Sequence, residues 1–153
     1  MINPSIIIKS KHWPRRLNQI KYIVNNNIKN KRFFKFKKNI TYYCNFVLMN
    51  DLLIKKYNKF YNKKNQSTDV LTFISNLKKD SVIEKHCDIM ISADTAIKDA
   101  KKNNKNFYDH ITHLIVHSML HINGYSHNNN KDYIKMKDKE IKILEKLGIS
   151  DPY

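Results

Sequence analysis

The sequence predicts an α+β fold in which a small mixed β-sheet packs against helices. Short segments rich in β-branched and aromatic residues are typical of strands, and longer segments with apolar residues three or four positions apart are typical of helices. Strand-like and helix-like segments are mixed along the chain, which favours this class. A length of 153 residues suits one domain, 1–153, because such a chain buries about two-thirds of its unfolded surface.

The first third of the chain is expected to form two strands and two helices. Strands are predicted at 6–8 and 41–49, where β-branched and aromatic residues predominate. Proline is compatible with the first turn of a helix, so a helix is predicted from Pro14 to about Ile28. Asn50 can cap a second helix, which we expect directly after the second strand.

Two more strands are predicted in the middle of the chain, at 69–75 and 87–92, after a polar loop at 62–68. The residues between these strands, 76–85, are mostly polar and are interpreted as a connection.

Three helices are expected in the remaining chain. Ser92 or Asp94 can cap a helix that reaches about Lys102. Apolar residues at helical spacing predict further helices at 108–122 and 131–147. The helix at 108–122 is almost wholly apolar apart from its histidines, so we expect it at the centre of the fold.

The chain carries a large positive charge, because 29 Lys and Arg against 13 Asp and Glu give a net charge of +16. A field of this sign attracts polyanions, which favours RNA or DNA as a partner. The alternative is drift in nucleotide composition. The chain is rich in residues with AT-rich codons, so lysines could accumulate on its surface without a selected partner.

The sequence favours a soluble protein of the reducing cytoplasm. Cys44 and Cys87 are far apart and form no Cys-x-x-Cys pair, which argues against a disulfide framework or a thiolate zinc cluster. The apolar run at 6–8 is too short for a signal peptide or a membrane span. We therefore expect no membrane attachment.

Five of the seven histidines lie between residues 110 and 127, and helix geometry limits which can share one ion. Residues four apart on a helix lie about 6 Å apart on one face, whereas residues eight apart lie about 12 Å apart. His113, His117 and His121 therefore cannot all bind one ion, but one adjacent pair can. Gly124 permits the positive φ that reverses the chain, and it can bring His127 beside His117 and His121.

His117, His121 and His127 are thus predicted to hold one metal ion at the end of the central helix. Three imidazoles with an open position for water are typical of catalytic zinc, so zinc is the favoured cofactor. Nickel, copper and iron are compatible with the same residue types. The alternative, packing as ordinary core or interface histidines, is the interpretation kept for His110 and His113. His113 lies one turn before His117 and could also orient a ligand.

The same spacing of histidines and glycine occurs in metzincin peptidases, which carry glutamate after the first histidine as general base. This chain has Ser118 at that position. Serine is a poor base, so a metallopeptidase is the least favoured hypothesis.

The run at 113–127 resembles the YbeY-type bacterial endoribonucleases, the rRNA maturation factors. The similarity extends over residues 58–153. Residues 67–73 are similar to that family's P-T-D-V-L-S-F segment, residues 88–92 to its G-D-I-x-I-S strand, and residues 147–153 to its C-terminal ending.

The resemblance implies a single α+β domain with zinc on the three histidines. It also implies single-strand-specific endoribonuclease activity in maturation of the 16S rRNA 3′ end and in ribosome quality control. Its partners would then be RNA and the small ribosomal subunit. The metal site and the positive charge agree with a metal-dependent ribonuclease.

Two positions depart from the family's pattern. The aspartate before the last histidine is Ser126, and the arginine that ends its N-R-x-Y-R segment is Asn62. Asparagine cannot neutralise a phosphate, so Lys59, Lys63 or Lys64 would have to supply the charge. The change at Asn62 bears on catalysis more than on metal binding, and it favours a second hypothesis, an rRNA-binding assembly factor without catalysis.

The sequence names metal ligands but no catalytic residue, because no carboxylate lies within the histidine run. Asp69 and Asp88 are candidate bases through the resemblance alone. The attacking group, which is water or the neighbouring 2′-hydroxyl, and the oligomeric state stay open.

Overall fold

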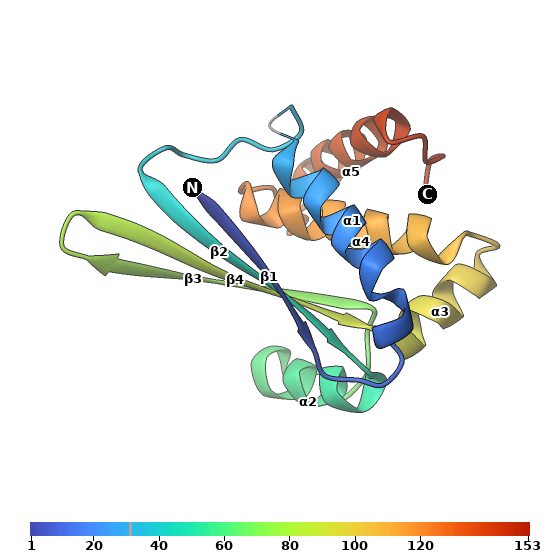
Figure 1. Cartoon of the computed structure of the whole chain (residues 1–153). Coiled ribbons are helices and arrows are strands. Elements are labelled where there is room, and N and C mark those ends of the chain that lie inside the picture. Colours follow the sequence, from blue (N-terminus) through green and yellow to red (C-terminus); the bar gives the residue numbers. More distant parts are fainter. Residues whose placement is uncertain (31) are drawn as a thin grey trace.

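The computed structural model describes residues 1–30 and 32–153 and confirms the predicted α+β class. Its sheet has four strands in the order β1-β2-β4-β3 (Figure 1). The strands are β1 (Ile2–Ile8), β2 (Ile40–Met49), β3 (Val70–Lys79) and β4 (Val82–Ser92). β1, β2 and β4 are parallel, whereas β3 pairs antiparallel with β4 at one edge. The sheet is therefore mixed, as predicted, although its first strand begins at Ile2 rather than at residue 6.

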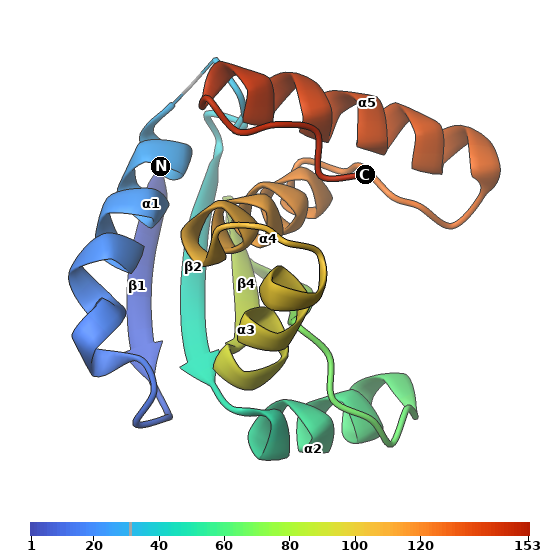
Figure 2. The ribbon, with the colours of Figure 1, turned by 90° about the vertical axis from the view of Figure 1, so that its right-hand side faces the viewer.

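The described part of the chain contains five α-helices, of which the first four contact strands and the fifth packs on the fourth (Figure 2). They are α1 (Leu17–Lys29), α2 (Asp51–Asn62), α3 (Ala93–Lys102), α4 (Phe107–Ile122) and α5 (Asn130–Lys146). In Figure 2, α1, α3 and α4 lie in front of the sheet, and α2 lies below the end of β2. None of the helices in these described residues has the length and apolar character needed to cross a bilayer.

Two hydrophobic clusters cover the two faces of the sheet. Successive side chains of a strand point to opposite faces. In β2, Phe46 and Leu48 accordingly belong to the large cluster shared with α1, α4 and α5. Met49 belongs instead to a smaller cluster that includes Ile54 of α2 and Met90 of β4. The helix that carries the histidines is thus packed against the main core.

α4 is the central helix of the main core. It contacts α1, α3, α5 and the strands β3 and β4. Apolar side chains on several sides of it, including Ile111, Ile115, Met119 and Leu120, are completely buried. A helix that is apolar nearly all round is expected to be enclosed by other elements. This enclosure fixes the directions in which its histidines can point.

The interpretation of 76–85 as a polar connection is wrong. β3 extends to Lys79 and β4 begins at Val82, so the turn is confined to Asp80 and Ser81, with Asp80 at a φ of 54°. Most side chains in this half of β3 are exposed, so it lacks the apolar alternation of a half-buried strand. Backbone pairing with β4, rather than side-chain burial, makes it a strand.

The predicted N-cap of α3 is confirmed in its position but not in its hydrogen bond. Ser92 occupies the N-cap position, but its hydroxyl donates to Asp51 Oδ1 at 2.6 Å instead of accepting from a helix amide. Asp94 is likewise used elsewhere, because its Oδ2 accepts from the backbone amide of Asp51 at 3.0 Å. By contrast, Asn50 caps α2 as predicted and accepts from the amide of Leu53 at 3.0 Å.

Candidate metal centre

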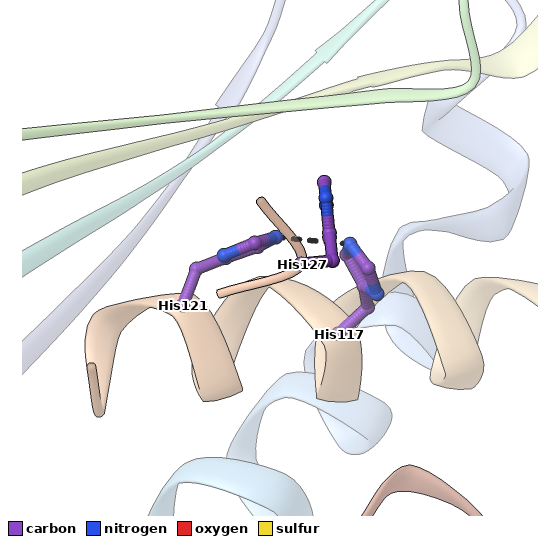
Figure 3. A group of neighbouring side chains, drawn as sticks. All are labelled: His117, His121 and His127. Atoms are coloured by element: carbon purple, nitrogen blue, oxygen red, sulfur yellow. Dashed lines mark hydrogen bonds between the residues drawn. The ribbon is translucent and has the colours of Figure 1, made fainter. Parts of the chain in front are cut away.

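The three predicted metal-binding histidines lie together on the side of α4 that faces the strands (Figure 3). His117 and His121 project from the same face of α4, and His127 follows in the loop before α5. α4 ends at Ile122, and Gly124 then adopts a φ of 90°, a backbone conformation that residues other than glycine rarely adopt. The predicted glycine turn therefore exists, and it returns the chain so that His127 lies beside the other two.

The nitrogens of these histidines are close enough to share one ion. Nε2 of His117 and Nε2 of His121 are 3.1 Å apart, and one ring nitrogen from each of the three residues lies within 4.8 Å of the others. Two nitrogens bound tetrahedrally to zinc at about 2.0–2.1 Å would lie about 3.3 Å apart. The residues present therefore fit a zinc ion, and occupation by a metal stays a prediction.

The surroundings of His121 favour its neutral form. Burial lowers the pKa of His121 to about 4, and the fields of His117 and His127 act in the same direction. Its Nδ1 lies 3.1 Å from the backbone carbonyl of Tyr125, to which a protonated Nδ1 donates. That hydrogen bond leaves Nε2 unprotonated, with its lone pair directed at the other two rings. An imidazole with an unprotonated nitrogen is the form that binds a metal.

A buried glutamate of α5 holds His117 in the same way. Glu140 is fully buried, and its Oε1 accepts from Nδ1 of His117. Its Oε2 accepts from Nε2 of His113 at 3.1 Å and from the hydroxyl of Tyr153. Burial alone would raise the pKa of Glu140, but the hydrogen bonds from His113, His117 and Tyr153 outweigh it and lower the pKa to about 2. Glu140 is thus an ionised partner that fixes the tautomer of His117.

Sequence reasoning missed Glu140, although a signal for it exists. Met136, Ile143 and Leu144 form the buried face of α5, and Glu140 falls on that face at helical spacing from all three. A carboxylate at a core position is almost never fully buried unless it is paired. Its position alone therefore indicates a buried partner on a facing helix.

The histidines form one wall of an open pocket of about 570 Å³. The other walls come from the end of α2, from β3 and from the loop after α4. The residues that line it are Asn62, Val70, Leu71, Thr72, Ile74, His117, His121, His127 and Asn128. A volume of this size is in the range of small-molecule sites.

Other residues singled out from the sequence lie away from this pocket. Ser118, at the position of the peptidase base, is fully buried and donates to the carbonyl of Leu114 at 2.9 Å. The hydroxyl of Ser118 therefore cannot act on a molecule bound beside the histidines. Asp88 lies within β4, where its Oδ1 accepts from Nδ2 of Asn45 at 2.8 Å. Asp69 lies next to His110 instead.

Comparison with known proteins identifies the family. A sequence model described as "Endoribonuclease YbeY" matches residues 7–148 of this chain. The chain belongs to the YbeY endoribonuclease family. Membership in this family supports a nuclease of the hydrolase class whose substrate is RNA.

Individual relatives agree with the YbeY assignment. Endoribonuclease YbeY of Ehrlichia chaffeensis is 35% identical over 137 residues, which cover 88% of this chain and 83% of that protein. Endoribonuclease YbeY of Ruthia magnifica is 39% identical over 106 residues, covering 69% and 73%. The solution structure of TM1509 from Thermotoga maritima matches 98% of each chain with a TM-score of 0.56 and 20% identity, a likeness that concerns the fold alone.

The structure places both departures from the YbeY pattern. Ser126 donates to Oδ2 of Asp132 at 3.3 Å, so a carboxylate from the first turn of α5 contacts the side chain at position 126. Asn62, at the position of the family's arginine, lines the pocket, and its Nδ2 donates to Oδ1 of Asn58 at 3.0 Å. The pocket therefore lacks an arginine at its α2 wall.

Proposed function

We propose that this chain is a zinc-dependent endoribonuclease that cuts single-stranded RNA, with one zinc ion held by His117, His121 and His127. The observation that carries this proposal is the cluster of three imidazole nitrogens within 4.8 Å of one another at the wall of an open pocket. When bound, zinc would supply Lewis acidity, which activates water and polarises a phosphoryl oxygen.

The residues of the chain hold the ligands and provide contacts for the substrate. Glu140 and the carbonyl of Tyr125 accept from the Nδ1 atoms of His117 and His121, which directs both Nε2 atoms at the same point. Thr72 and Asn128 line the pocket and can donate hydrogen bonds to phosphate or sugar oxygens. Among the residues that line the pocket there is no carboxylate, so we assign no general base there.

Aromatic side chains of α2 favour a single-stranded substrate. Phe60 and Tyr61 are 70% and 54% exposed, and Tyr57 is stacked on Tyr61 with ring centroids 6.3 Å apart. These rings lie on the helix whose last residue, Asn62, lines the pocket. Exposed aromatic faces beside a basic surface stack unpaired bases, which a double helix does not offer. The net charge of +16 would attract the phosphate backbone.

We infer that the substrate is 16S rRNA of the small ribosomal subunit, cut in maturation of its 3′ end and in ribosome quality control in the cytoplasm. Membership in the YbeY family and the basic charge support this role. We also propose that residues 1–153 act as one domain, since the pocket takes its walls from α2, β3 and α4 together.

The test is a cleavage assay with purified protein on single-stranded RNA and on a duplex of the same sequence. Cleavage of the single strand should require zinc, stop on chelation and return when zinc is restored. The double variant His117→Ala/His121→Ala should bind no zinc and cut no RNA while its circular dichroism spectrum stays that of wild type. Full activity of the folded double variant would refute the proposal.

Asn62 favours one alternative, an rRNA-binding assembly factor that does not cut. Without an arginine at the α2 wall, the pocket has less charge with which to stabilise a phosphate during cleavage. Under this alternative, zinc-loaded protein binds single-stranded RNA in a salt-sensitive manner and leaves it intact at every zinc concentration. The cleavage assay therefore separates the two functions.

A further inference from the structure

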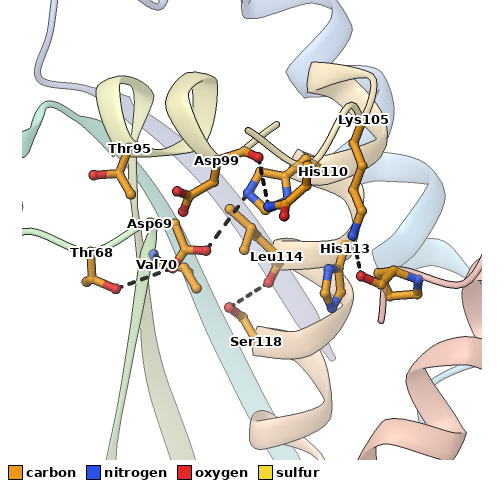
Figure 4. Close-up of polar contacts among 12 residues, drawn as sticks. Thr68, Asp69, Val70, Thr95, Asp99, Lys105, His110, His113, Leu114 and Ser118 are labelled. Atoms are coloured by element: carbon orange, nitrogen blue, oxygen red, sulfur yellow. Dashed lines mark hydrogen bonds and ion pairs between the residues drawn. The ribbon is translucent and has the colours of Figure 1, made fainter. Parts of the chain in front are cut away.

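A second group of side chains with the atom types of metal ligands lies at the other end of α4, outside the pocket described above (Figure 4). It consists of Asp69, which directly precedes β3, Asp99 on α3 and His110 in the first turns of α4. One ligand atom from each lies within 4.8 Å of the others. Three separate elements thus meet at two carboxylates and one imidazole.

His110 points into this group without a hydrogen-bond partner. Only 8% of the residue is exposed, and its Nε2 has no partner among the described residues. A buried polar atom left without a partner is destabilising, so such atoms normally indicate a missing ligand, water or ion. Burial is the largest influence on the pKa of His110 and lowers it, although the fields of Asp69 and Asp99 oppose this effect. The ring is therefore neutral, as a metal ligand must be.

The spacing fits ligands of one ion better than a direct ion pair. Nε2 of His110 lies 3.9 Å from Oδ2 of Asp69, which is too far for a hydrogen bond. Two ligands at about 2.1 Å from the same ion are separated by about 3 to 4 Å, depending on coordination geometry. The other oxygen of Asp69 is held by the amide of Val70 at 2.8 Å and the hydroxyl of Thr68 at 3.3 Å, and Oδ2 is the atom nearer to His110.

Charge favours a cation over a water molecule as the ligand. Two aspartates beside one histidine give this small site a formal charge of about −2. The ammonium group of Lys105, whose field reaches His110, donates to the backbone carbonyl of Pro152 and is engaged there. The side chain of Asp69 is 27% exposed, which leaves solvent access for an ion and its water ligands.

We propose that Asp69, Asp99 and His110 form a second metal site, which takes a divalent cation of the manganese type. Two carboxylates and one imidazole combine the oxygen ligands that Mn²⁺ prefers with a nitrogen that it accepts. His117 follows His110 by seven positions of α4, a rise of about 10 Å. Paired catalytic metals lie about 3.5–4 Å apart, so the two sites act separately.

The role of this second site is to hold the pocket wall. A cation on Asp69, Asp99 and His110 would tie the start of β3 to α3 and α4. The residues that follow Asp69, Val70 to Thr72, line the histidine pocket. Binding at one end of α4 would therefore stiffen the strand that faces the histidines at the other end.

The test measures metal binding and not RNA cleavage, so its outcome does not depend on the proposed function. The full chain is loaded with one equivalent of zinc, which prefers three imidazoles, and is then titrated with Mn²⁺. The free Mn²⁺ is followed by electron paramagnetic resonance. We expect one Mn²⁺ to bind per chain with a Kd in the micromolar range and to raise the melting temperature. The double variant His117→Ala/His121→Ala should bind the same single Mn²⁺, which separates this site from the first.

A matched pair of variants locates the ion. Asp99→Asn removes one ligand charge and should weaken Mn²⁺ binding at least tenfold, whereas Asp138→Asn removes an exposed charge on α5 and should leave it unchanged. Independently of any variant, bound Mn²⁺ should broaden the ring resonances of His110 before those of His86, which lies on β4. Absence of Mn²⁺ binding to wild type, equal effects of the two variants, or preferential broadening of His86 would each overturn the proposal.

Discussion

The two ends of α4 present histidines in contrasting surroundings. Near its C-terminus, His117 and His121 meet His127 at the wall of an open pocket, and the carboxylate of Glu140 stands behind the ligands. Near its N-terminus, His110 is buried and faces two carboxylates directly. Three imidazoles with an open side suit zinc that acts on a substrate, whereas two carboxylates and one imidazole from three elements suit an ion that holds those elements together. One helix can thus carry two sites of different purpose, distinguished by what faces each histidine.

The largest expected effect is on zinc affinity, and it should differ when a histidine at each end of α4 is replaced by alanine. His121→Ala removes one of three zinc ligands and should lower zinc affinity by more than about 100-fold, beyond the usual effect of losing an outer hydrogen-bond partner. His110→Ala should leave zinc affinity unchanged, because His110 lies outside the three-histidine cluster. Titration against a chelator of known affinity measures the zinc affinity of each variant. Comparable losses of zinc in the two variants would contradict the separation of the sites.

The next effect tests whether the carboxylate behind the ligands matters. Glu140→Gln keeps the shape of the side chain but removes the charge that accepts from Nδ1 of His117. We expect zinc affinity to fall roughly 10- to 100-fold, the range for such outer partners. Glu145→Gln on the exposed face of α5 is the matched control and should have no effect. If both variants bind zinc as wild type does, Glu140 serves packing alone.

The grouping of His117, His121 and His127 was predictable from the sequence because the three lie in one short run, while their role as metal ligands stays a prediction. Helix rise and the freedom of Gly124 decide that geometry locally, and the structure brings His117, His121 and His127 together as expected. The position of Glu140 on the buried face of α5 signals that it is paired, but the identity of its partners depends on how α5 packs on α4, which no local pattern encodes. The outer half of the β3–β4 hairpin was missed for a related reason, since pairing between strands and not side-chain burial creates it.

The same distinction between local and distant residues explains why the group of Asp69, Asp99 and His110 was not predicted from the sequence. Each residue has an ordinary local interpretation in the sequence, and only the arrangement of β3, α3 and α4 brings the three together. The fold class, by contrast, follows from patterns within each segment, so it was predicted correctly even though several element boundaries were not.

A smaller effect concerns the α2 wall of the pocket. Asn62→Arg would place a cation where the chain now has an amide, and an Arg–phosphate hydrogen bond contributes about 1.5–3 kcal/mol, less where solvent screens it. We therefore expect roughly a tenfold gain in RNA cleavage. Asn65→Arg adds the same charge in the loop that follows α2, outside the pocket, and controls for general attraction. Equal gains in both variants would show that charge alone, and not the position at the pocket, is limiting.

The smallest expected effect concerns the aromatic surface of α2. Phe60→Ala removes a ring that is 70% exposed, and stacking of a base on an aromatic side chain contributes about 1–3 kcal/mol. Because Tyr61 still offers a face beside it, we expect a loss near the lower limit, roughly fivefold in affinity for single-stranded RNA and none for duplex. Leu52→Ala, on the same helix and 66% exposed, removes an apolar side chain without a ring and is the control. Fluorescence anisotropy with short labelled RNAs measures these affinities. A loss that is equal for single strand and duplex would mean that Phe60 contacts the backbone, and the preference for unpaired RNA would then have to come from the pocket itself.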